Sequence, residues 1–310
     1  MTSVPTSPVG VPGQVAPEPL TSAADPGPPP VRATPQHLRA HRGLFVVRLV
    51  AALVISVVVL FPLYWMVVVA LSSRADLLGG TLRLWPRELT TENFSRVLAA
   101  FPVTTWFGNS VAIALTTAII TVVVNLLGGY AFAQLRFRGS NALFLTALAT
   151  LTLPVQVIMV ALFRMVTVLG LYGSYWAVIL PTAASAFGLF LARQFILAIP
   201  RDLVEAARID GAGHLRVFTR IVLPLSKPLV AVLFFMSLLS TWNDFAWPLI
   251  ALQDNRLFTL PIGLLYLQGQ FGPDYGATMA FALINVTPMV VLFLVFQRYF
   301  VQGFARSGIR

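Results

Sequence analysis

A polar segment between two long apolar runs carries the most informative residues of the sequence. It reads IPRDLVEAARIDGAGHLRVFTRIVLPLSKP from Ile199 to Pro228. Its charged side chains and glycines are unsuited to lipid, where charges and open backbone groups are costly. We therefore expect the segment to lie in water, and the chemistry it offers is recognition of another protein.

Residue types that support catalysis, redox chemistry or metal binding do not occur at useful spacings. The chain has no cysteine, which excludes disulfides and thiol chemistry. His37, His41 and His214 have no second ligand at metal spacing, and no Ser, His and Asp set is arranged as in a hydrolase. There is no G-x-x-x-x-G-K-[ST] loop, and the only lysine, Lys227, does not follow a glycine loop. We expect no enzyme activity, no metal, no cofactor and no ATP bound by this chain.

The polar segment begins with a short predicted helix. Pro200 suits a helix entrance, and Asp202 with Glu205 three residues later forms a variant of the capping box. We predict a helix over Leu203–Ile209. Gly211 ends it, because glycine adopts the left-handed conformation of a helix end at little cost.

This predicted helix carries both small and charged side chains. Ala206 and Ala207 allow a partner to approach the backbone closely, and Glu205 and Arg208 supply charge at the rim. This pattern is typical of a plug for a groove in another protein. On these residues alone, an amphipathic helix lying on the membrane surface is an equally good interpretation.

A second short segment follows, over Leu215–Leu223. Phe218 and Ile221 lie three residues apart and form a narrow apolar stripe that we expect to pack beneath the first helix. Pro224 and Pro228 then break the helix.

The composition is that of an integral membrane protein. Of the 310 residues, 57% are hydrophobic and 10% are charged, against roughly 45–50% and 25% in an average soluble domain. The mean hydropathy is +0.83. The formal charge of +10 lies in the segments between apolar runs, so we interpret it as a topology signal.

Six apolar runs follow a proline-rich tail. Residues 1–43 hold ten of the 22 prolines and are predicted to be a disordered tail. A six-helix membrane domain spans 44–303, with the polar segment 199–228 as a loop, and a short tail covers 304–310. Each run exceeds the about 20 residues that cross a bilayer as a helix. The runs are Leu44–Leu71, Phe107–Leu135, Ala142–Val166, Tyr175–Leu197, Leu229–Leu252 and Met279–Val301.

Basic residues predict the topology. Fifteen of the 21 lysines and arginines lie on the side that holds both termini and the polar segment. The positive-inside rule therefore places both termini and Ile199–Pro228 in the cytoplasm. On the other side, Ser72–Trp106 is the largest piece, with a predicted helix over Glu92–Ala100. We expect it either to cap an outer vestibule or to connect two membrane helices.

Within the polar segment, EAA-x-x-DGA resembles the EAA loop of the membrane subunits of bacterial ABC importers. Many specified positions fall together, which makes the signal specific. The matching residues are Glu205, Ala206, Ala207, Asp210, Gly211, Ala212, Ile221, Leu223 and Pro224.

The similarity extends over roughly residues 60–303 and looks like the second, six-helix permease of a maltose-type sugar importer. The motifs that carry it are Phe107-Gly108-Asn109-Ser110, Gly129-Tyr130-Ala131-Phe132-Ala133, Arg193-Gln194-Phe195, Trp242-Asn243-Asp244-Phe245 and Gln297-Arg298-Tyr299-Phe300. One departure is the C-terminus. The family often ends in a Gly-Gly-Val-Lys-like tail, whereas this chain ends Ala305-Arg306-Ser307-Gly308-Ile309-Arg310, which weakens a family role of the tail at the ATPase.

The resemblance implies an all-α, polytopic, type I ABC importer permease fold in the bacterial cytoplasmic membrane, translocating a mono- or oligosaccharide. Its implied partners are a second homologous permease, two ATPase subunits that bind ATP and Mg, and an extracytoplasmic solute-binding protein. The implied coupling residues are Glu205, Ala206, Ala207, Arg208, Asp210, Gly211, Ala212, Leu223 and Pro224. One alternative function is a permease for a polyol or a sugar phosphate. A secondary transporter or a structural membrane subunit is a less favoured alternative.

A substrate pathway is predicted around the only acidic residue inside an apolar run, Asp244. Its neighbours combine hydrogen-bonding and flat apolar groups, as a sugar requires. We place Asn109, Trp242, Asn243, Asp244 and Trp247 on a translocation pathway or gate, with Asp244 holding the gate. The alternative is a belt of interfacial aromatic residues beside a snorkelling acid. Most other polar residues of the runs are assigned to hydrogen bonds between helices: Asn125, Gln156, Ser185, Ser237, Ser240, Asn285 and Thr287.

Overall fold

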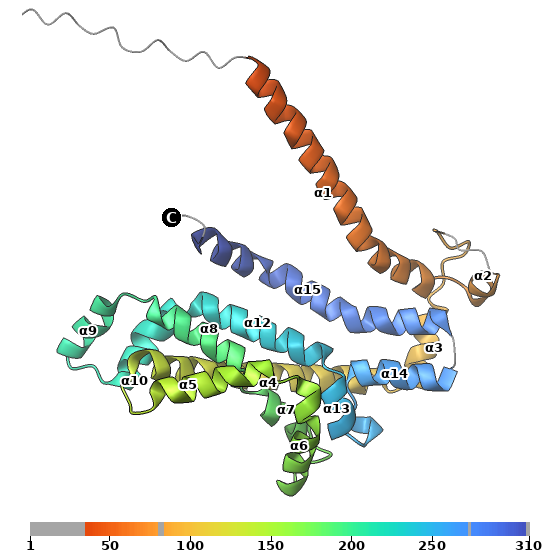
Figure 1. Ribbon diagram of the computed structural model, residues 1–310. Coiled ribbons are helices and arrows are strands. Elements are labelled where there is room, and N and C mark those ends of the chain that lie inside the picture. Colours follow the sequence, from red (N-terminus) through yellow and green to blue (C-terminus); the bar gives the residue numbers. More distant parts are fainter. Residues whose placement is uncertain (1–34, 80–83, 272–273, 308–310) are drawn as a thin grey trace, which may run out of the picture. The chain divides into compact units, whose positions relative to one another are not determined.

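The computed structural model describes residues 35–79, 84–271 and 274–307, and most of them are helical (Figure 1). The chain divides into two compact units, Met1–Val58 and Val59–Arg310. Most of the predicted N-terminal tail lies outside the described residues. The first helix begins at Pro35, earlier than the predicted Leu44, and proline suits the first turn of a helix.

Three helices in the described part of the chain are long and apolar enough to cross a membrane. They are α1 (Pro35–Ala70), α4 (Val103–Gln134) and α15 (Tyr275–Ser307). Their apolar stretches contain 26, 32 and 23 residues, with hydropathies of 2.7, 2.3 and 2.4. These lengths exceed the about 20 residues that a crossing needs, so the first, second and last predicted runs are confirmed as helices.

Three further candidate crossings are bent pairs of helices. Helix α5 (Ser140–Ala149) with η1 (Thr150–Thr152) meets α6 (Val155–Val168) at 111°, and α7 (Tyr175–Thr182) meets α8 (Ala186–Leu197) at 42°. The third and fourth predicted runs are therefore bent rather than straight. Pro154 removes an amide at the first break, and at the second the Ser185 hydroxyl caps α8 by accepting from the Gly188 amide at 3.1 Å.

The fifth predicted run is also interrupted. The third bent pair joins the segment before it, His214–Leu225, to α12 (Lys227–Asn243) at 78°. Helix α12 ends at Asn243, so the predicted run Leu229–Leu252 is not a single helix. The short helices α13 (Ala246–Ala251) and η3 (Asn255–Leu257) follow, and then α14 (Leu260–Phe271), which the sequence did not predict.

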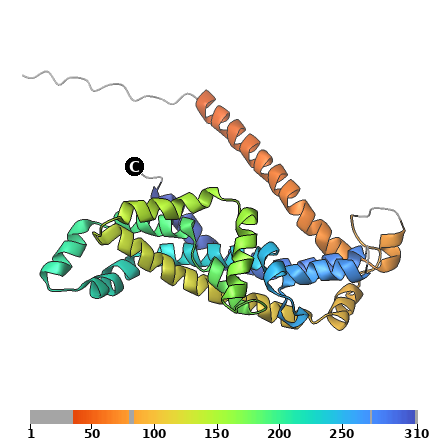
Figure 2. The ribbon, with the colours of Figure 1, turned by 60° about the horizontal axis from the view of Figure 1, so that its bottom comes forward.

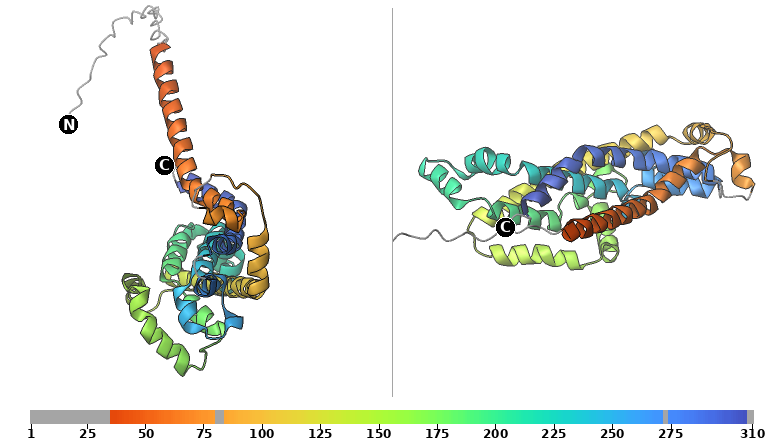
Figure 3. Two further views of the ribbon diagram at one scale, coloured as in Figure 1. Left: turned by 90° about the vertical axis from the view of Figure 1, so that its right-hand side faces the viewer. Right: turned by 90° about the horizontal axis from the view of Figure 1, so that it is seen from above.

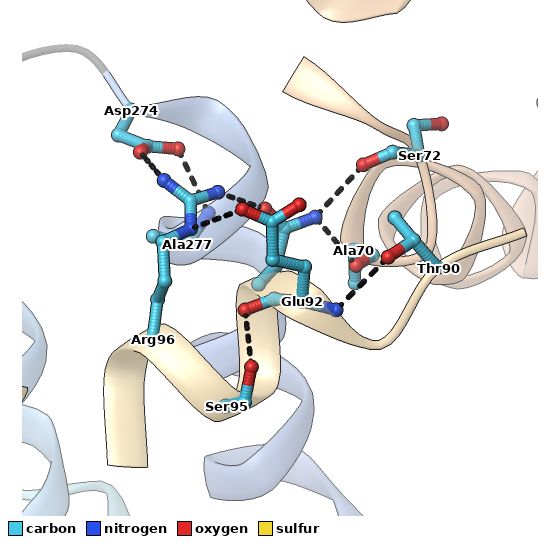
Figure 4. Close-up of polar contacts among 9 residues, drawn as sticks. Ala70, Ser72, Thr90, Glu92, Ser95, Arg96, Asp274 and Ala277 are labelled. Carbon is cyan, nitrogen blue, oxygen red and sulfur yellow. Dashed lines mark hydrogen bonds and ion pairs between the residues drawn. The ribbon is translucent and has the colours of Figure 1, made fainter. Parts of the chain in front are cut away.

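A network of polar side chains joins the elements between the first two long helices (Figure 4). After α2 (Arg74–Leu78), helix α3 covers Glu92–Ala100, as predicted. From α3, the buried Asn93 amide donates to the carbonyls of Ala70 at 2.8 Å and Ser72 at 2.9 Å. These bonds fix α3 against the end of α1.

The same network reaches α15. Arg96 forms an ion pair with Asp274 at 2.8 Å and a hydrogen bond with the side-chain oxygen of Asn93. Asp274 also accepts from the Ala277 amide at 3.0 Å, in the first turn of α15. A part-buried ion pair with further hydrogen bonds is stronger than an exposed one. Helix α3 is therefore held to the ends of two long helices.

Helix α4 is the central element of the second unit and packs against α8 and α12. Close approach of α4 to α8 depends on Gly129, because a β-carbon there would lie 2.6 Å from the Ala192 β-carbon. Helix α5 runs outside this group (Figure 3). Beyond one end of α4 project α9 (Arg201–Ile209) and α10 (His214–Val217), at the end opposite to α3 (Figure 2).

Candidate coupling surface and polar cavity

The exposed helix α9 is the candidate docking element. It begins one residue after Pro200, which occupies the N-cap position and provides no side-chain hydrogen bond. The predicted capping box of Asp202 and Glu205 is therefore not formed, and Asp202 lies in the first turn instead. There its negative charge is favourably placed near the positive end of the helix dipole.

The C-terminal end of α9 has the geometry that the sequence predicts. Gly211 has a φ of +80°, in the left-handed region. The Ala212 amide donates to the Ala207 carbonyl at 2.9 Å, and the Gly211 amide to the Arg208 carbonyl at 3.0 Å. This pair of bonds is a Schellman motif, which satisfies carbonyls that a helix end leaves open. Helix α9 is thus a short element with a fixed end.

The residues of α9 separate onto two opposite faces, because side chains three or four positions apart share a face. Arg201, Val204, Glu205 and Arg208 face the ends of α4 and α8. Leu203 and Ala206 lie on the other face, and both are exposed. The predicted coupling residues are consequently divided, with Ala206 pointing outward and Glu205 and Arg208 pointing inward.

Large apolar side chains are also exposed at the end of α9 and after it. Ile209 and Leu215 have 86% and 74% of their surface exposed, although both are large and apolar. Asp210 is also exposed. Exposed apolar groups of this size indicate a contact surface for a protein or a lipid.

The segment after α10 packs beneath α9 with a different set of residues from the one predicted. A π-helical turn, η2 (Phe218–Val222), leads into α11 (Leu223–Leu225). Phe218 is buried as expected, but Val217 and Val222 accompany it in place of Ile221, which is half-buried. The wider turn changes which side chains face inward. Leu223 and Pro224 are exposed.

A basic hollow of about 530 Å³ lies between α9 and the ends of α4 and α8. We use this name for the space lined by Ala133, Gln134, Leu135, Arg136, Leu197, Arg201, Val204, Glu205, Arg208 and His214. Its wall is joined to α4 through Tyr130, whose hydroxyl lies 3.3 Å from His214 Nδ1, and Arg208 reaches the same nitrogen at 3.3 Å. The hollow carries more positive than negative side chains.

The predicted pathway residues do not come together in one place. The indoles of Trp242 and Trp247 are buried and donate to the carbonyls of Asn285 at 3.1 Å and Ala177 at 3.0 Å. Asn109 is buried too, and its amide donates to the carbonyls of Arg256 at 2.7 Å and Phe258 at 2.9 Å. These contacts hold helices and loops together.

Asn243 and Asp244 lie at the end of α12. The Asn243 side chain is exposed and donates to the Leu239 carbonyl at 2.9 Å. Asp244 follows the helix rather than lying within it, and its carboxylate accepts from the Trp247 amide at 3.4 Å. Of the five predicted pathway residues, Asp244 lines a cavity between α4, α12 and the junction of α7 with α8.

A polar cavity of about 380 Å³ lies between α4, α12 and the junction of α7 with α8. Hydroxyl and amide groups dominate its polar wall, and Ser237 donates to Thr121 across it at 3.0 Å. The lining residues are Thr121, Asn125, Thr182, Ala184, Ser185, Phe187, Gly188, Leu233, Met236, Ser237, Ser240, Thr241 and Asp244. We call it the polar cavity.

Asn125 is the most informative residue of this wall. It is 1% exposed, and its side-chain nitrogen has no hydrogen-bond partner. Gly188 makes room for it, since a β-carbon there would lie 2.3 Å from that nitrogen. An unsatisfied buried donor costs about 1–3 kcal/mol, so this position is unfavourable for stability alone.

The sequence indicated these polar residues but not their grouping. Asn125, Ser185, Ser237 and Ser240 were assigned to hydrogen bonds between helices. One such bond is present, between Ser237 and Thr121. Thr121 and Asn125 are four residues apart, so the 3.6-residue turn of a helix places them on one face of α4. This spacing is the sequence signal that could have predicted a shared polar site. In the described residues no group of three or more His, Asp or Glu side chains could hold a metal.

Comparison with known proteins places the chain among membrane components of binding-protein-dependent systems. Residues 125–306 match the family described as binding-protein-dependent transport system inner membrane component. The arabinooligosaccharides transport system permease protein AraQ of Halalkalibacterium halodurans is 37% identical over 83% of this chain and 93% of its own length. The sn-glycerol-3-phosphate transport system permease protein UgpE of Rhizobium meliloti is 32% identical over 81% and 92%.

A solved structure has the same fold. A chain of a bacterial ABC transporter involved in the import of the acidic polysaccharide alginate superimposes with a TM-score of 0.77. The match covers 84% of this chain and 98% of that one, at 22% identity.

Proposed function

The chain belongs to the family of binding-protein-dependent transport system inner membrane components, and from this premise we propose that it is the permease subunit of an ATP-driven importer that carries a sugar. The observation that carries the proposal is the match to AraQ over 83% of this chain and 93% of the relative. Relatives with sugar-transport names and the fold of a polysaccharide importer support it.

The proposed topology has six crossings with both termini in the cytoplasm. Three single helices and three bent pairs provide these crossings. The excess of basic residues on one side of the membrane, as counted along the sequence, supports the orientation. Helix α9 then lies in the cytoplasm, where ATP is available to a partner.

The proposed energy source is a pair of separate ATPase subunits that bind ATP and Mg and dock on α9. Ala206 and Leu203 form the outward face, and the fixed end at Gly211 lets α9 move as a rigid element. A second homologous permease and an extracytoplasmic solute-binding protein complete the proposed complex. The family description, which names binding-protein dependence, supports the last partner.

The proposed sugar route includes the polar cavity. Sugars present hydroxyl groups that both donate and accept, and the cavity offers hydroxyls, an unpaired amide at Asn125 and the carboxylate of Asp244. A sugar hydroxyl would satisfy the Asn125 nitrogen, which the chain itself leaves without a partner. Asp244, at the end of α12, is proposed to hold a gate.

The route is tested by replacing Asn125 with leucine, which is similar in size. Because the amide is unpaired, Asn125→Leu should leave the thermal unfolding midpoint unchanged or higher. We expect ATP-driven sugar uptake by reconstituted vesicles to fall about tenfold or more, the loss of one hydrogen bond between neutral groups being about 1.4 kcal/mol.

The matched control is Thr117→Val, which removes another buried, unpaired polar group of α4 that does not line the cavity. It should leave uptake unchanged. Asp244→Asn should reduce uptake while leaving co-purification of the ATPase intact. Wild-type uptake in both Asn125→Leu and Asp244→Asn would remove the cavity from the route.

A sugar phosphate or polyol is the second candidate substrate, favoured by the 32% identity to the glycerol-3-phosphate permease. A panel of sugars, polyols and sugar phosphates offered to the cognate binding protein, with stimulated ATPase activity as the readout, decides between them. Stimulation by a sugar supports the first proposal, and stimulation by a sugar phosphate alone supports the second.

A further inference from the structure

The basic hollow beneath α9 has the composition of an anion site. Arg136 comes from the residues after α4, Arg201 and Arg208 from α9, and His214 from the start of α10. Glu205 is the single carboxylate in the wall. Three guanidinium groups from two parts of the chain face one carboxylate, so the site has an uncompensated positive charge.

The proposed ATPase contact does not use the hollow. Leu203 and Ala206 face outward, whereas Arg201 and Arg208 share the opposite side of α9. A partner seated on the outward face would leave the hollow between α9 and the membrane domain. The positive charge of the hollow is therefore available to a different ligand.

The hollow lies at the boundary of the membrane domain. Gln134 is the last residue of α4, and Leu197 is the last residue of α8. Helix α4 is a candidate crossing and α8 is the second half of one, so we place their ends near the lipid headgroups. A second hollow of about 600 Å³ shares Arg136 with the first and adds Arg138. Basic pockets beside helix ends are suited to anionic headgroups.

We propose that the basic hollow binds a phosphate group, supplied by the headgroup of an anionic lipid or by a soluble phosphate. A guanidinium donates two parallel hydrogen bonds to phosphate oxygens, and Arg136 and Arg201 come from opposite walls. A bound phosphate would link α9 to the end of α4 and thereby restrict the element that is proposed to receive the ATPase motion.

The test uses the transporter purified with its partner subunits. Native mass spectrometry measures retained phosphatidylglycerol against phosphatidylcholine, and the rise of the unfolding midpoint with inorganic phosphate reports the soluble source. At about 1 kcal/mol per arginine, Arg136→Gln with Arg201→Gln should weaken phosphatidylglycerol binding about thirtyfold. Arg136→Gln alone should weaken it about fivefold and serves if the double variant does not fold.

The matched control is Arg220→Gln, an exposed arginine of the same polar segment that does not line the hollow. It should retain phosphatidylglycerol as the wild type does. Selective loss in the Arg136 variants supports a lipid source, and loss of only the inorganic phosphate response supports a soluble one. Equal binding of both probes by wild type and double variant would overturn the proposal. Binding is measured without transport, so a failure of the sugar proposal would leave this result unaffected.

Discussion

At the scale of single residues, the most consequential position is Gly211. Its φ of +80° closes the end of α9, and there is open space around it. A side chain would therefore be disfavoured by the backbone conformation and not by a clash. The left-handed conformation costs a residue with a β-carbon about 1 kcal/mol.

We expect Gly211→Ala to loosen the end of α9 by this amount. Hydrogen exchange of the Ala212 amide, which donates to Ala207 at 2.9 Å, should quicken about fivefold. Gly213→Ala is the control, since Gly213 has a φ of −70° and open space around it. Equal exchange in the two variants would show that the left-handed turn does not hold the helix end.

The role of a residue was predictable from the sequence where it depends on backbone conformation. It was not predictable where it depends on packing against distant helices. Gly211 was recognised because few other residues suit its conformation. The capping box at Asp202 failed because Pro200 takes the N-cap position. The sequence did not predict that the indoles of Trp242 and Trp247 donate to carbonyls in the core. Such partners come from distant helices and leave no local signal.

At the scale of elements, close helix packing depends on Gly129. A β-carbon at this position would lie 2.6 Å from the Ala192 β-carbon and 2.9 Å from the Ala192 carbonyl carbon. Since backbone is involved, α4 and α8 would have to move apart. Overpacking of this kind costs about 1–3 kcal/mol.

Gly129→Ala should accordingly lower the unfolding midpoint of the purified transporter. Gly108→Ala, in the same helix but with nothing within 4 Å, should keep or raise it because alanine favours helix by about 1 kcal/mol. Both midpoints are read in one thermal unfolding experiment in detergent. A midpoint of Gly129→Ala equal to or above that of Gly108→Ala would contradict this account of the α4–α8 contact.

The positions of apolar elements were predictable, but the angles of their bends were not. Apolar runs located α1, α4 and α15 because length and hydropathy are local properties. The 111° bend at Pro154 and the end of α12 at Asn243 depend on neighbouring helices that accept the broken backbone. Helix α14, with 12 residues, is too short to be recognised as a crossing.

At the scale of the whole molecule, the two proposed activities lie at different places along α4. The polar cavity reaches Thr121 and Asn125, in the second half of the helix, and the basic hollow lies at its C-terminal end. Helix α8 reaches from one to the other, contributing Gly188 to the cavity and Leu197 to the hollow. We therefore expect movement of α9 to reach the cavity through these packed helices.

The central claim is that partner ATPase subunits drive transport through the outward face of α9. The most direct measurement is co-purification of the ATPase with Ala206→Trp, together with ATP-driven sugar uptake. The matched control is Ala99→Trp, at an exposed alanine of α3, which like α9 has nine residues but lies at the other end of α4. We predict that Ala206→Trp loses both the ATPase and uptake while Ala99→Trp keeps the ATPase. Wild-type levels of both in Ala206→Trp would contradict the claim.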